Sequence, residues 1–196
     1  MTDEAIKASV LKEIIKLSQA GHKVVLVHGG GPFINKILDT VQIESEFIGG
    51  HRKTSKEAMK YIEMALKGEV NSDLVTLINK LGHSAVGLSG KDAGLIIAKK
   101  RIFQENGKDV DLGMVGDVFK VKAGILYDLM EKRHIPVVAC IAADENGNTY
   151  NVNADMMAGA LAGELEVDEY IVLTDIDGLR EKIEDPRTLI KKLPLK

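Results

Sequence analysis

A short polar cluster from Tyr150 to Asp155 has residue types well suited to binding a small ligand. It reads Tyr-Asn-Val-Asn-Ala-Asp, so two amides, Asn151 and Asn153, precede a carboxylate. The cluster follows an apolar run typical of a buried strand and opens a segment rich in Ala, Met and Leu that is typical of a helix. Ligands bind at the carboxyl ends of strands in doubly wound sheets, so we expect these side chains to orient a ligand. The alternative is that Asn and Asp only cap the helix.

A glycine triplet, 29–31, is the second candidate site. It lies between an apolar strand-like run, 24–27, and a predicted helix, 32–40, whose first residue is Pro32. Glycines leave backbone N–H groups accessible to an anion, and the N-terminus of a helix attracts negative charge. We therefore expect a phosphate or a carboxylate here, with a plain tight turn as the alternative. The pattern matches neither the dinucleotide-binding fingerprint nor a Walker loop.

Two further segments carry side chains that could contact a ligand. Arg52 lies in a glycine-flanked loop, where its guanidinium could hold a carboxylate through two parallel hydrogen bonds. A solvated surface arginine is the alternative. The segment 85–92 imitates a Walker loop, but Ala85 replaces its first glycine and Asp92 replaces the Ser or Thr that would hold Mg²⁺. We interpret this segment as a strand followed by a polar turn.

The composition excludes several classes of function. A formal net charge of −3 gives no electrostatic argument for a nucleic-acid or membrane-surface partner, and the absence of Trp argues against a base-stacking platform. The single cysteine, Cys140, excludes an internal disulfide and lies in an apolar run, where a thiol is inert. The five histidines lack the spacing of a zinc site, so no metal site is expected. With no signal-peptide pattern and no apolar run long enough to span a bilayer, we expect a cytoplasmic protein.

Apolar periodicity predicts alternating helices and strands. The predicted helices are 3–20, 32–40, 54–81, 123–132 and 154–165; the predicted strands are 24–27, 85–88, 136–141 and 170–173, the last one buried; antiparallel ribbons are expected over 96–121 and a hairpin or loop over 47–52. Thr54 and Glu57 have the spacing of a capping box, while Gly68 and Asn71 suggest a break or kink. This alternation predicts an α/β fold, an αβα sandwich with a mostly parallel central sheet.

Five motifs, taken together, closely resemble those of the acetylglutamate kinases in the amino acid kinase family. In chain order they are Val-His-Gly-Gly-Gly-Pro (27–32), Arg-Lys-Thr (52–54), Gly-Leu-Ser-Gly-Lys-Asp (87–92), Asn-Val-Asn-Ala-Asp (151–155) and Thr-Asp (174–175) with Gly178. The resemblance covers almost the whole chain. It implies a single amino acid kinase-like domain, 1–196, with a substrate lobe over 1–142 and the start of a nucleotide lobe over 143–196.

The resemblance also implies an activity. It is the ATP-dependent phosphorylation of the side-chain carboxylate of N-acetyl-L-glutamate to N-acetyl-L-glutamyl 5-phosphate, a step of arginine biosynthesis, with Mg²⁺ carried by the nucleotide. The implied assembly is a homodimer. Two alternatives stay open: a kinase for a related acylamino acid such as N-acetyl-aminoadipate, and a non-catalytic protein that binds acetylglutamate.

Individual residues take roles from the resemblance. Gly30 and Gly31 match backbone donors beside the transferred phosphoryl group, Arg52 matches the arginine that binds the substrate α-carboxylate, and Asn151 matches the asparagine that holds the rest of the substrate main chain. Asp155 matches the aspartate that organises two catalytic lysines. The residues that match the nucleotide side are Thr174, Asp175, Gly178 and Leu179. The family's Lys-Gly-Gly strand and its C-terminal lysine segment have no counterpart in this sequence, so we expect this chain to bind N-acetylglutamate better than it turns it over.

Overall fold

The computed structural model describes residues 4–105, 107–174, 178–182 and 184–192. The chain divides into two compact units, one up to Glu166 and one from Val167 onward. Each unit is described by itself. The boundary between a substrate lobe and a nucleotide lobe, expected near residue 142, stays a prediction. Residues on both sides of position 142 belong to the first unit.

A parallel sheet of three strands forms the centre of the first unit. Its order is β1 (Leu26–His28), β7 (Ile135–Ala139) and β4 (Ala85–Ser89). His28 and Ser89 are both in register with Ala139, so the three strands end level with one another. The loops that follow them therefore leave from the same edge of the sheet, which we call the carboxyl edge.

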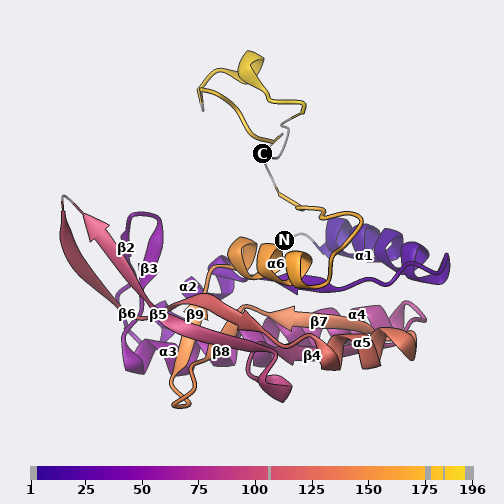
Figure 1. The fold of residues 1–196 in the computed structure, drawn as a ribbon, viewed down its shortest axis with the longest axis horizontal. Coiled ribbons are helices and arrows are strands. Elements are labelled where there is room, and N and C mark those ends of the chain that lie inside the picture. The colour runs from indigo at the N-terminus through magenta and orange to yellow at the C-terminus, as the bar shows by residue number, and fades with distance from the viewer. Residues whose placement is uncertain (1–3, 106, 175–177, 183, 193–196) are drawn as a thin grey trace. The chain divides into compact units, whose positions relative to one another are not determined.

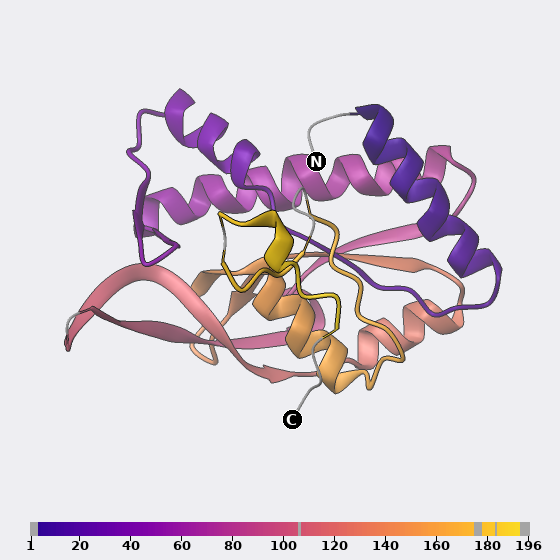
Figure 2. The same cartoon turned by 90° about the horizontal axis from the view of Figure 1, so that it is seen from above.

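Helices cover both faces of this sheet. On one face, α1 (Glu4–Gln19) and α4 (Ser72–Lys80) pack against β7 through a cluster that contains Leu11, Ile78 and Val137. On the other face, α5 (Gly124–Glu131) and α6 (Ala154–Glu164) bury apolar side chains in the cluster that contains Val138. Figure 2 shows the long helix that includes α4 on one side of the strands and α5 and α6 on the other. The predicted αβα sandwich is confirmed.

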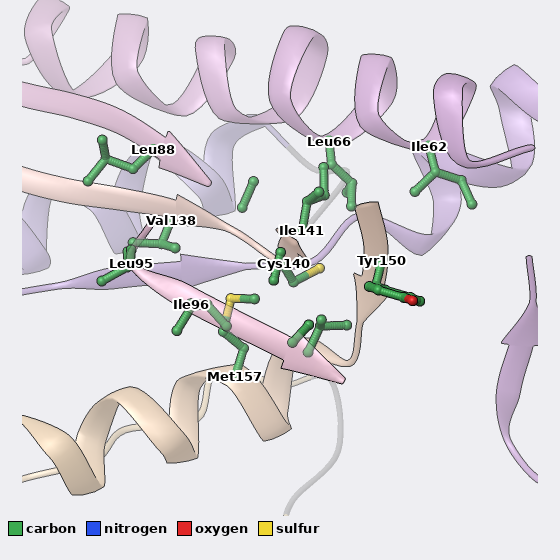
Figure 3. Packing of buried hydrophobic residues seen from close by; sticks show 14 of the residues in the cluster. Ile62, Leu66, Leu88, Leu95, Ile96, Val138, Cys140, Ile141, Tyr150 and Met157 are labelled. Carbon is green, nitrogen blue, oxygen red and sulfur yellow. The ribbon is translucent and has the colours of Figure 1, made fainter. Parts of the chain in front are cut away.

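The core continues where β7 passes through Cys140 into β8 (Ile141–Ala143). Figure 3 shows Met157 of α6 on one side of Cys140 and Ile141, and Leu66 of the long helix on the other. Cys140 is buried, as predicted, and burial raises the pKa of its thiol to about 12. The thiol therefore stays protonated at neutral pH.

The long helix is continuous from residue 56 to residue 80. It consists of α3 (Lys56–Glu63), a π-helical segment η1 (Met64–Asn71) and α4. The irregularity expected near Gly68 takes the form of this π-helical segment and not of a break, because the wider turns absorb extra residues without losing the helical path. The N-terminal cap is Ser55, one residue later than expected, and its hydroxyl accepts a hydrogen bond from the Ala58 N–H at 3.0 Å.

A hairpin and a long ribbon complete the first unit. The predicted hairpin consists of β2 (Glu46–Ile48) and β3 (His51–Lys53), and the predicted ribbon consists of β5 (Ile96–Glu105) and β6 (Lys108–Val121). With β8 and β9 (Thr149–Val152), the ribbon strands form a closed barrel. Figure 1 shows the hairpin beside the projecting part of the ribbon, and Thr54 pairs there with Gly113. The predicted helix 32–40 is α2 (Gly31–Thr40).

The second unit corrects one prediction. Residues 170–173 form no strand, and Tyr170, Ile171, Val172 and Leu173 are 47–61% exposed, so the expected buried strand is wrong. Apolar composition makes a segment suitable for a buried strand, but a strand forms only where a neighbouring strand accepts its backbone hydrogen bonds. Further along, the unit contains a short 3₁₀ turn, η3 (Pro186–Thr188), and the Glu181 N–H donates to the carbonyl oxygen of Thr188 at 3.1 Å.

Candidate functional site

Two helices begin next to each other at the carboxyl edge. The glycine triplet after β1 leads directly into α2, while the chain after β7 passes through β8 and β9 into α6. A Cβ atom added to Gly29 would lie 3.3 Å from the Cβ of Ala154, the first residue of α6. The N-termini of α2 and α6 are therefore neighbours, and each carries the partial positive charge of a helix start.

The glycine triplet presents open space at the start of α2. A Cβ on Gly30 would lie 2.6 Å from Leu66 and 3.3 Å from Val70, so Gly30 allows the turn to approach η1 closely. Among the described residues, nothing lies within 4 Å of the position of a Cβ on Gly31, and no side chain of theirs caps the helix. The first N–H groups of a helix have no intrahelical acceptor, so these donors suit an anion in the open space.

Asn71, in η1, fixes the strand that leads into the triplet. Its Nδ2 lies 2.9 Å from Nε2 of His28 on β1 and donates to the carbonyl oxygen of Val137 on β7, also at 2.9 Å. Because Nε2 of His28 accepts from an amide, Nδ1 carries the hydrogen and donates to the carbonyl oxygen of Gly29 at 2.9 Å. Burial, and then the nearby charge of Lys67, lower the pKa of His28 against the opposing effect of that backbone bond. The imidazole is therefore neutral at neutral pH.

Arg52 is a buried residue held by three side chains. Only 8% of it is exposed. Its Nη2 donates to Oδ1 of Asn35 at 2.7 Å, and its Nη1 donates to the hydroxyl of Ser45. Its guanidinium carbon lies 4.5 Å from the centre of the Phe47 ring, within cation–π range. The alternative of a solvated surface arginine is wrong.

The guanidinium of Arg52 keeps capacity for a ligand. A guanidinium has five N–H donors, of which Asn35 and Ser45 use two. Burial lowers the pKa of Arg52 and the charge of Asp39 raises it, but an arginine stays charged at neutral pH. Within the described part of the chain, no carboxylate forms an ion pair with it. Since a buried charge is costly without a partner, a ligand carboxylate would stabilise this group.

Asn35 connects Arg52 to the glycine triplet. It follows Gly31 by four residues in α2, so it lies on the same helix face, about 6 Å further along the axis. Two groups suited to anions, the start of α2 and the guanidinium of Arg52, are thus held along one helical turn. A small ligand with two negatively charged ends fits this arrangement.

The cluster that ends at Asp155 has mixed roles. Asn153 caps α6, with Oδ1 accepting from the Met156 N–H at 3.0 Å, so the capping alternative is confirmed for this residue. Asn151 lies on β9, and among the described residues its side-chain amide has no hydrogen-bond partner. Asp155 is exposed in the first turn of α6, and its charge contributes to the raised pKa of Cys140.

The polar turn after β4 is closed by its own side chains. Asp92 accepts from the N–H and the hydroxyl of Ser89, at 2.6 and 3.0 Å, and Nζ of Lys67 lies 3.4 Å from the same carboxylate. Lys91 is paired with Glu63 at 2.8 Å. These contacts confirm the interpretation as a polar turn, since the lysine and the carboxylate are engaged within the protein.

Of the four residues predicted to contact the nucleotide, three lie in the second unit and one lies outside the described residues. Thr174, Gly178 and Leu179 lie in the second unit, where the carbonyl oxygen of Leu179 accepts from the Ile190 N–H at 2.8 Å. Asp175 lies outside the described residues. A role for these four residues in nucleotide binding stays a prediction.

The described ranges lack two kinds of feature. No three His, Cys, Asp or Glu residues there are arranged to hold a metal ion. None of the helices in the same ranges combines the length and apolar character needed to cross a membrane.

Comparisons with known proteins agree with one another. A family model described as "Amino acid kinase family" matches residues 1–196. The acetylglutamate kinase of Heliobacterium modesticaldum is 43% identical over 98% of this chain and 67% of its own length, and that of Corynebacterium jeikeium is 45% identical over 98% and 61%. The chain thus spans less than two thirds of the length of the second relative. Among solved structures, smu.665 from Streptococcus mutans superposes with a TM-score of 0.77 at 31% identity, covering 87% of this chain and 68% of that one.

Proposed function

This chain belongs to the amino acid kinase family and has its α/β fold, and on that premise we propose that the protein phosphorylates the side-chain carboxylate of N-acetyl-L-glutamate with ATP as the donor. One observation carries the proposal. Two groups suited to anions, the uncapped start of α2 and the buried guanidinium of Arg52, are linked through Asn35. N-acetylglutamate has a carboxylate at each end and would engage both.

Each group has a proposed part in binding the substrate. Arg52 would hold the α-carboxylate through two parallel hydrogen bonds, a geometry that orients as well as attracts. The N–H groups at Gly30 and Gly31 would hold the side-chain carboxylate and the charge that develops on it. Asn151 would orient the rest of the substrate main chain through its uncommitted amide, and Asp155 would organise cationic groups near the reacting oxygen.

Phosphoryl transfer needs residues that bind and orient the substrate more than it needs a nucleophilic side chain. Phosphoryl transfer depends mainly on alignment of the reactants and on neutralisation of charge. The open space at Gly31 and the uncapped N-terminus of α2 fit oxygens of a phosphate. ATP, when bound with Mg²⁺, supplies the phosphoryl group. The residues Thr174, Asp175, Gly178 and Leu179 are our candidates for contacts with the nucleotide.

The names of similar proteins support N-acetyl-L-glutamate as the proposed substrate. Relatives at 43% and 45% identity over nearly all of this chain carry the name acetylglutamate kinase, although the chain spans only 67% and 61% of their lengths. The activity, its place in arginine biosynthesis, the homodimer and the cytoplasmic location are therefore proposals for the whole protein.

Binding and turnover test the proposal separately. Calorimetric titration of N-acetyl-L-glutamate into the 196-residue chain measures binding, and a coupled assay of ADP release measures turnover. Turnover that disappears in Asp155→Asn, with an unchanged circular dichroism spectrum, would support both the reaction and the role of Asp155. Because the family's Lys-Gly-Gly strand and C-terminal lysine segment have no counterpart in this sequence, ADP release is also measured in a version that carries both. Binding without ADP release in that version would favour the non-catalytic alternative. No binding and no ADP release with any acylamino dicarboxylate would overturn the proposal.

A further inference from the structure

Asn35 is placed to control the distance between the two anion-binding groups. Arg52 has three side-chain contacts in the described residues, and two of them, Ser45 and Phe47, come from the hairpin and the segment that leads into it. Asn35 alone forms a hydrogen bond to Arg52 from α2, the helix whose N-terminus is the other anion-binding group. Asp39, one turn further along α2, acts on Arg52 through its charge.

The two ends of this link are supported independently. On the side of α2, Ile34 and Leu38 are buried in the core, and Gly30 packs tightly on η1. On the side of the hairpin, a Cβ on Gly49 would lie 2.0 Å from the ring of Phe103, so the hairpin tip packs closely on the ribbon. Hairpin and helix therefore rest on different parts of the protein, and the bond between Asn35 and Arg52 joins them.

We propose that Asn35 is a positioning residue that sets the spacing between Arg52 and the start of α2, and so selects the length of the dicarboxylate that binds. The inference rests on the proposed function and adds a determinant of specificity to it. Asn35 is exposed, so its side chain has no role in the core that would explain it. Its amide oxygen holds the guanidinium without neutralising it, which leaves the positive charge for the ligand.

A fixed distance between Arg52 and the start of α2 should make the site selective for the length of the dicarboxylate that binds. One methylene more or less in a binding site commonly changes affinity about 10–200-fold when the site cannot adjust. Without Asn35, Arg52 would keep its contacts on the hairpin side and the long-range charge of Asp39, but no hydrogen bond from α2, so the guanidinium could follow a shorter or a longer ligand. Selectivity should then fall even if the affinity for one ligand changes little.

Three ligands that differ by one methylene make the test. N-acetyl-L-aspartate, N-acetyl-L-glutamate and N-acetyl-L-2-aminoadipate are titrated calorimetrically into the 196-residue chain and into Asn35→Ala, Asn35→Asp and Lys36→Ala. Lys36 is the next residue of α2 and is also exposed, so Lys36→Ala is the matched control. The parent and Lys36→Ala should prefer N-acetylglutamate by about tenfold or more over the other two ligands.

The two variants at Asn35 separate geometry from charge. Asn35→Ala should reduce the preference to about threefold or less, because the link is lost. Asn35→Asp keeps an acceptor for Arg52 but adds a negative charge, so it should weaken all three ligands together by about tenfold and keep the preference. An unchanged melting temperature in both variants shows that the fold is intact.

The outcomes distinguish this inference from the proposed function. If the parent selects N-acetylglutamate and Asn35→Ala selects it equally well, the positioning role is wrong and the proposed function stands. If the parent binds all three ligands equally, the inference also fails, since there is no selectivity to set. If the parent binds none of them, both proposals fail.

Discussion

The side-chain amide of Asn71 lies 2.9 Å from Nε2 of His28 and joins the π-helical segment η1 to the strand that leads into the glycine triplet. The same amide donates to the carbonyl oxygen of Val137 on the central strand. One buried side chain thus connects a helix to two neighbouring strands just before the carboxyl edge. π-helical turns occur frequently at functional sites, and here such a turn ends in the residue that supports the candidate site.

Replacement of Asn71 by Ala should destabilise the protein. The change would remove the amide donor from the Nε2 of half-buried His28 and from the carbonyl oxygen of buried Val137, and a buried polar group that loses its partner costs about 1–3 kcal/mol. We expect the free energy of unfolding, measured by urea denaturation, to fall by about 2–4 kcal/mol in total. Ser72→Ala is the control, because the exposed Ser72 hydroxyl donates only to the carbonyl oxygen of Lys67. A loss below about 0.5 kcal/mol for Asn71→Ala would contradict the bridging role.

Two neighbouring glycines should respond differently to the same methyl group. Gly30→Ala places a Cβ 2.6 Å from Leu66, so we expect destabilisation by about 1–3 kcal/mol from overpacking. Gly31→Ala meets open space at the start of α2, so the melting temperature should stay within a few degrees of the parent. Calorimetry should nevertheless show weaker binding of N-acetylglutamate in Gly31→Ala, since the methyl group occupies the space proposed for the ligand. Equal stability losses in both variants would refute this account of the turn.

Substrate binding should depend on Arg52 more than on other side chains of the site. Arg52→Ala removes a buried guanidinium that is proposed to pair with a carboxylate, so it should cost about 2–5 kcal/mol in binding free energy. Arg52→Lys should recover only part of this, because an ammonium group cannot form the bidentate pair. Calorimetric titration of N-acetylglutamate into both variants measures the loss. Unchanged affinity in both would remove Arg52 from the site.

The half-buried imidazole of His28 should make stability depend on pH. Burial lowers the pKa of His28 in the folded protein below its ordinary value of 6.5. Below that value the unfolded chain binds a proton that the folded protein does not, so stability is lost as the pH falls through 6.5 toward the folded pKa. Denaturation at a series of pH values should show a smaller decrease of stability in His28→Gln than in the parent.

A second histidine provides the comparison for this pH series. Burial, aided by the charge of Arg101, also lowers the pKa of His51, so part of the slope should remain in His28→Gln and disappear only when His51 is replaced as well. The same slope in the parent and in the double variant would show that neither imidazole carries the effect.

Local patterns in the sequence determined the elements and their order. Apolar positions repeated every three to four residues predict α1, because one face of a helix must be buried, and a composition rich in Ala, Met and Leu predicts α6. Gly29–Gly31 with Pro32 predicts the turn and the helix start, since both depend on the backbone preferences of those residues alone. The order of strands and helices also predicts the parallel sheet and the edge at which ligands bind.

Contacts between distant residues were decided only by the tertiary structure. Asn35 and Arg52 are 17 residues apart, and His28 and Asn71 are 43 residues apart, so no spacing rule links either pair. The burial of Arg52 and the exposure of residues 170–173 have the same explanation, because burial depends on which neighbours cover a residue. The residue types thus identify groups able to bind an anion. The packing of α2, the hairpin and the ribbon against one another decides which of these groups lie near each other and how far apart they are.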